Sequence, residues 1–100
     1  MTVRFSNGLG HLFDKETPDF AIAKINYQLT ETDPTKFSKR RWWGDFSTGD
    51  QLKHSGNFYI EFEEGRRGEI VVIPDTEASS KKAQTWYYHF NGRSSLSRKR

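Results

Sequence analysis

The sequence contains no cysteine, and this absence excludes several kinds of protein. Without thiols the chain has no disulfide framework, no thiolate zinc site and no cysteine nucleophile. Long apolar runs are also missing. The N-terminus lacks the apolar core of a signal peptide, and no segment approaches the roughly 18 apolar residues that a membrane-spanning helix needs. We therefore expect a cytoplasmic protein that does not associate with a membrane.

Motifs that indicate catalysis or cofactor binding are missing as well. The sequence has no P-loop, no dinucleotide-binding glycine motif, no Gly-x-Ser-x-Gly elbow and no EF-hand loop. Its three histidines, His11, His54 and His89, do not have the spacing of metal ligands on a helix. We expect a non-enzymatic protein with no catalytic residues, no metal and no small-molecule cofactor.

Aromatic residues compensate for a low hydrophobic content. Hydrophobic residues make up only 33% of the 100-residue chain, but 15% of the chain is aromatic. Because aromatic side chains bury more area than aliphatic ones, a few of them can fill a small core. A chain of this length forms one domain, and we predict a folded domain rather than a disordered chain.

The positive charge is concentrated at the C-terminus. Residues 93–100 contain four of the 16 basic residues and no acid, which leaves 12 Lys and Arg against 13 Asp and Glu, a net charge of −1, in residues 1–92. This location weakens the argument for nucleic-acid binding that a pI of 9.3 suggests. We predict a domain over residues 1–92 and a flexible basic tail over residues 93–100, which serves as an electrostatic arm, a localisation signal or a solubilising end.

Period-two alternation is the main structural signal in the chain. It is clearest over residues 20–30, and similar runs cover residues 58–62 and 85–91. The apolar run 69–73 ends at Pro74, and residues 75–84 are predicted to form a polar loop. Five or six short strands with turns between them are typical of a small antiparallel barrel, of the SH3-like or OB-like kind.

The N-terminal residues predict a hairpin. Asn7-Gly8 is a strong signal for a two-residue turn, because both central residues of such a turn have positive φ. This register would place Val3, Phe5 and Leu12 together on one face, which supports it. Gly10 is unfavourable in a strand, so an irregular loop is the alternative.

The segment Lys39–Phe46 combines three consecutive cations with two tryptophans. We predict a strand that begins at Phe37 or Lys39. On a strand Trp42, Gly44 and Phe46 share the inner face, while Lys39, Arg41 and Trp43 share the outer one. By the same alternation Arg40 would point to the inner face, and we expect it near the strand end, where its side chain reaches water.

The cations and rings of the outer face predict a binding surface. The residues proposed to contact a partner are Lys39, Arg41, Trp43, Tyr59, Tyr87 and His89. Interfaces favour Trp, Tyr and Arg, so a protein partner or self-association is the preferred hypothesis, through this face or through an edge strand.

Single-stranded nucleic acid is the alternative partner, because bases stack on exposed rings and phosphates attract cations. Tyr59 shares its predicted face with Glu61 and Glu63. These acids would repel phosphate, and we expect them to pair with the cations of the neighbouring strand.

Overall fold

The computed structural model describes residues 3–36, 39–53, 55–80 and 84–98. Within these residues the strands are β1 (Val3–Asp14), β2 (Ala21–Thr32), β3 (Arg41–Thr48), β4 (Gly56–Glu61), β5 (Arg66–Ser80), β6 (Thr85–Gly92) and β7 (Ser97–Arg98). The described residues contain no helix, and hence none that is long and apolar enough to cross a membrane.

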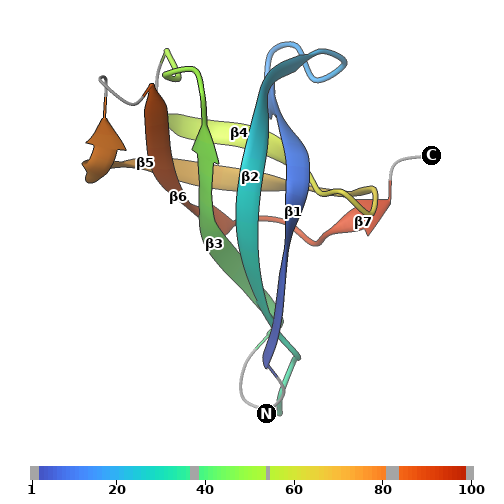
Figure 1. Cartoon of the computed structure of the whole chain (residues 1–100). Coiled ribbons are helices and arrows are strands. Elements are labelled where there is room, and N and C mark those ends of the chain that lie inside the picture. The colour runs from blue at the N-terminus through green and yellow to red at the C-terminus, as the bar shows by residue number, and fades with distance from the viewer. Residues whose placement is uncertain (1–2, 37–38, 54, 81–83, 99–100) are drawn as a thin grey trace.

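Six antiparallel strands close into a barrel (Figure 1). The order around the barrel is β1, β2, β3, β6, β5 and β4, and the pairing of β4 with both β5 and β1 closes it. The short β7 adds to β5 at Arg66 and Arg67. The prediction of a small antiparallel barrel of five or six strands is therefore confirmed, with six strands.

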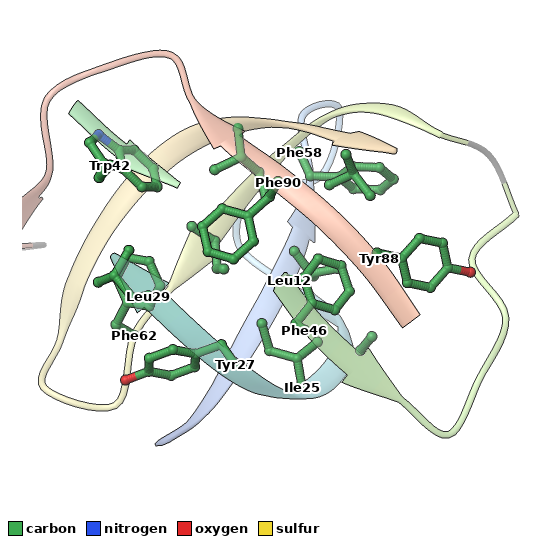
Figure 2. Packing of buried hydrophobic residues seen from close by; sticks show 14 residues of the cluster. Leu12, Ile25, Tyr27, Leu29, Trp42, Phe46, Phe58, Phe62, Tyr88 and Phe90 are labelled. Atoms are coloured by element: carbon green, nitrogen blue, oxygen red, sulfur yellow. The ribbon is translucent and has the colours of Figure 1, made fainter. Parts of the chain in front are cut away.

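Large rings fill the barrel interior (Figure 2). The fully buried aromatic side chains Phe46, Phe58, Phe62 and Phe90 come from β3, β4, the turn after β4, and β6. Other rings pack around them, as in the edge-on contact of Tyr27 with Phe62, whose centroids are 4.8 Å apart. Because each strand alternates between faces, these strands also carry polar side chains outward. The predicted aromatic core is confirmed.

The N-terminal hairpin that Asn7-Gly8 predicts does not form. β1 is one continuous strand paired with β2, in which Gly8 lies opposite Tyr27 and Phe5 opposite Thr30. Gly8 and Gly10 leave room for the Tyr27 ring, and a side chain at Gly10 would also collide with the Glu61 carbonyl. The glycines thus permit close packing rather than a turn. Phe5 is exposed while Leu12 is buried, so the two residues do not share a face as the hairpin register predicts.

Pro74 does not end its strand either. β5 continues to Ser80, where it pairs with Thr85 of β6. Since β4 accompanies β5 only as far as Val72, Pro74 lies where β5 has a single described neighbour, and a proline is tolerated at such an edge. Of the loop predicted over residues 75–84, residues 75–80 are strand, while residues 81–83 lie outside the described residues.

The segment that follows β6 lies against one end of the barrel. The Arg93 backbone N–H donates to the Glu69 carbonyl (2.7 Å), and the Ser94 carbonyl accepts a hydrogen bond from Trp42 Nε1 (2.8 Å). Leu96 packs against the core. These contacts hold the described part of the predicted tail, residues 93–98, and residues 99–100 lie outside the described residues.

Candidate binding surface

An open groove of about 1190 Å³ lies where β2 ends, β3 begins and β6 ends. Four cationic side chains line it: Lys39, Arg40 and Arg41 before and at the start of β3, and Arg93 after β6. We call it the basic groove. The start of β3 is held in place by the Arg41 backbone N–H, which donates to Thr32 Oγ1 at 3.1 Å. The Trp42–Ser94 hydrogen bond holds the opposite wall, which carries Arg93.

The groove is electropositive because its cations lack acidic partners. Within the part of the chain that the structure describes, none of the four cationic side chains forms an ion pair. All four residues are exposed to solvent. Because none of them is held in an ion pair, these cations favour an anionic ligand.

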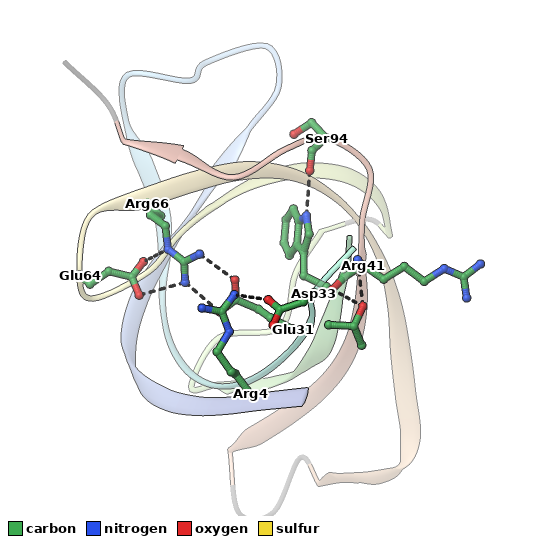
Figure 3. A network of polar contacts seen from close by, with 9 residues as sticks. Arg4, Glu31, Asp33, Arg41, Glu64, Arg66 and Ser94 are labelled. Carbon is green, nitrogen blue, oxygen red and sulfur yellow. Dashed lines mark hydrogen bonds and ion pairs between the residues drawn. The ribbon is translucent and has the colours of Figure 1, made fainter. Parts of the chain in front are cut away.

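Glu31 is the acid that lines the groove, and Arg66 neutralises it (Figure 3). Its two carboxylate oxygens accept hydrogen bonds from Arg66 Nη1 and Nη2 at 2.7 and 3.0 Å. Glu64 holds the same guanidinium from the other side, through a 2.7 Å bond from Arg66 Nε. These bonds from Arg66 lower the pKa of the buried Glu31 carboxyl, so it stays ionised and paired. Arg40 contributes to the same shift through its positive charge, so Glu31 offsets part of the charge of the groove cations.

Trp43 borders both the basic groove and a second, smaller hollow. The side chain is 39% exposed on the outer face of β3. It also lines a hollow of about 480 Å³ together with Phe5, which is 76% exposed, and with polar residues that include Asp45. Phe5, Thr30 and Trp43 lie in one row across β1, β2 and β3. The same indole thus contributes to a cationic groove and to a hollow with a mixed apolar and polar lining.

The structure brings together half of the predicted contact residues. Lys39, Arg41 and Trp43 share the basic groove. His89 of β6 lies opposite Asp45 of β3 and borders the smaller hollow, but its Nε2 lies 3.1 Å from Asp75 Oδ2.

Tyr87 and Tyr59 are not part of either hollow. Tyr87 lies opposite Ser47, two side-chain rows along the outer face from Trp43. Tyr59 is on β4, which is separated from β3 by two strands in each direction around the barrel. The expected pairing of Glu61 with the β3 cations does not form either, because Glu61 pairs with Arg67 of β5 at 3.4 Å.

Three residues of this surface escaped the sequence prediction. The hairpin hypothesis placed Phe5 on one face with the buried Leu12, and Arg93 was assigned to a flexible tail. Arg40 is exposed just before β3, as expected for a residue that reaches water near the strand end, but it was not included among the contact residues. A signal for Phe5 was present, because Val3, Phe5, Asn7 and Leu9 keep one parity through Asn7-Gly8. No local signal places Arg93 beside Lys39, since the closure of the barrel brings them together.

Comparison with known proteins finds no match to this chain, whether among protein families, curated proteins or solved structures. Among the described residues, no three His, Asp or Glu side chains are grouped so that they could hold a metal ion. His54 lies outside the described residues.

Proposed function

We propose that this barrel is a non-enzymatic protein-binding module, which recognises an acidic, partly apolar segment of a partner protein. The observation that carries the proposal is the position of Trp43 between the basic groove and the Phe5 hollow. Tryptophan and arginine are the residues most enriched at binding hot spots, where a buried ring supplies contact area. The groove cations supply electrostatic attraction and select against basic partners.

Single-stranded nucleic acid is the second candidate, and the position of Arg93 favours it. This residue adds a fourth cation to the groove beside an exposed indole, which is the combination that single-strand binders use. Two observations favour a protein over nucleic acid. Tyr59 and Tyr87, the predicted stacking partners, lie away from the groove, and four cations neutralise only a few phosphates.

Other expectations accompany this proposal. The barrel is proposed to be of the SH3-like or OB-like kind, in which binding sites on the barrel surface are common. Cytoplasmic location, the absence of catalysis and the absence of a cofactor also stay predictions, based on the motifs that the sequence lacks.

Selection from a random peptide library tests the proposal. Displayed peptides of about 12 residues, long enough to cross the groove as an extended chain, are selected on the wild-type protein. They are counter-selected on a variant with Arg41→Ala and Trp43→Ala. Fluorescence anisotropy with fluorescently labelled copies of the selected peptides then measures their affinity. We expect acidic and apolar residues in the selected peptides, weaker binding at high salt, and an affinity loss of about tenfold or more in Trp43→Ala.

The matched control is Tyr59→Ala, which removes an aromatic ring on the opposite side of the barrel from β3 and should leave the affinity unchanged. Failure to enrich any peptide, or equal binding to the wild type and the double variant, would contradict a protein-binding surface here. Tighter binding of a labelled single-stranded oligonucleotide, lost in the same double variant, would favour the second candidate.

A further inference from the structure

The first half of β1 has a strand on only one side (Figure 1). β1 pairs with β2 from Val3 onward, whereas β4 accompanies it only over His11–Asp14. Among the described residues, no strand lies beside Val3–Gly8 on the side away from β2. This stretch is therefore a free edge of an otherwise closed barrel.

The orientation of one hydrogen bond shows which backbone groups the edge presents. The Leu9 N–H donates to Glu63 Oε1 at 3.3 Å, so it points away from β2. Because successive residues of a strand direct their backbone groups to opposite sides, Val3, Phe5 and Asn7 point the same way as Leu9. Each of the three presents an N–H and a C=O at the free edge, and the side chain of Glu63 ends this row at Leu9.

This edge lacks the features that normally prevent strand addition. Edge strands are commonly protected by proline, bulges or charged side chains. The second overhang, on β5 beyond Val72, has Pro74, Asp75 and Glu77. Over Val3–Asn7 there is no proline, and the bulge of β1 lies farther along, between Leu12 and Phe13. The one charged side chain, Arg4, forms an ion pair with Asp33 at 3.3 Å.

We propose that a second copy of this chain adds to the edge in antiparallel orientation, with the two-fold axis at Phe5. In this register Phe5 faces Phe5 of the second copy, and Val3 faces Asn7 of the second copy on each side of the axis. All three facing pairs direct their backbone groups toward each other, so each pair exchanges two hydrogen bonds. The edge is therefore complementary to itself.

The side chains of the edge fit the same register. Arg4 lies opposite Ser6 of the second copy, so no like charges face each other. The Phe5 rings, the most exposed of the large apolar side chains at 76%, meet on the outer face of the joined sheet. This self-complementarity in backbone, charge and apolar contact favours a second copy over an unrelated strand.

Sedimentation equilibrium over a range of concentrations tests the proposal. Since the ladder is shorter than a standard interface, we expect a wild-type dimer that dissociates in the range of about 1–100 µM. Asn7→Pro removes an edge donor but no β1–β2 hydrogen bond, and Phe5→Lys places two cations at the axis. Both variants should be monomeric, with circular dichroism and melting temperature showing that they fold.

Phe20→Lys is the matched control, because Phe20 is 73% exposed but lies in the connection after β1. It should dimerise like the wild type. The register has its own test, since the chain has no native cysteine. Phe5→Cys should form a disulfide-linked dimer on mild oxidation, because directly opposed strand residues lie within disulfide range, and Phe20→Cys should not. A wild type that is monomeric at every concentration, or a dimer that survives both edge variants, would overturn the proposal.

Discussion

Trp42 and Trp43 are neighbours in β3, yet their environments are opposite. Trp42 is 6% exposed, packs edge-on against Phe62 with centroids 6.0 Å apart, and donates its indole N–H to the Ser94 carbonyl. Trp43 is 39% exposed and contributes to two surface hollows. The same residue type therefore stabilises the barrel on one face of β3 and remains available to a partner on the other.

The largest expected effect on stability comes from Trp42, the inner of the two tryptophans. Trp42→Ala should lower the free energy of unfolding by about 3–5 kcal/mol, because it leaves a cavity beside Phe62 and removes the anchor of residues 93–98. Chemical denaturation followed by circular dichroism measures the change. A midpoint close to that of the wild type would show that the inner indole does not support the core.

A second prediction concerns the space around the Trp42 ring. A methyl group at Gly92 would overlap the indole, so Gly92→Ala should destabilise the barrel by about 1–3 kcal/mol. Gly49→Ala is the control, because nothing lies within 4 Å of the added methyl group there. The two melting temperatures should separate clearly, and equal values would contradict the packing described for Trp42.

Glu31 is the charged residue of the inner face, and its effect should depend on pH. Glu31→Gln should cost about 1–2 kcal/mol near neutral pH, between the values for exposed and buried ion pairs. The hydrogen bonds from Arg66 lower the pKa of the Glu31 carboxyl in the folded protein. The stabilisation by Glu31 is therefore complete above the pKa of this carboxyl in the unfolded chain, and it is lost as the pH falls through the pKa in the folded protein.

Urea unfolding of the wild type and of Glu31→Gln at acidic and neutral pH measures how the stabilisation by Glu31 depends on pH. The difference in stability between the two proteins should shrink as the solution becomes acidic. A difference that stays constant with pH would mean that Glu31 contributes through packing rather than through its charge.

The alternation of these strands could be predicted because it is a local property. Ile25, Tyr27 and Leu29 of β2, and Trp42 and Phe46 of β3, occupy the inner face that period two assigns to them. The same parity placed Trp43 and Arg41 outside and yielded the centre of the candidate surface. These predictions needed no knowledge of which strands are neighbours.

The features that were missed depend on distant residues. Asn7-Gly8 is a turn signal by itself, but Gly8 serves the Tyr27 ring of another strand. The tolerance of Pro74 depends on where β4 ends. Arg93 joins Lys39 only because β6 lies beside β3. Closure of the barrel determines all three, and no short stretch of sequence contains that information.

The smallest stability effect is expected for Trp43→Ala, which removes an outer-face ring that is 39% exposed and should lower the unfolding free energy by about 1 kcal/mol. The effect of Trp43→Ala on peptide binding tests the proposed role of Trp43 most directly. With peptides selected on the wild type, anisotropy should show that Trp43→Ala weakens binding by about tenfold or more while the barrel stays folded. Unchanged affinity, or a loss of binding explained by unfolding, would contradict the role of Trp43 as the centre of a protein-binding surface.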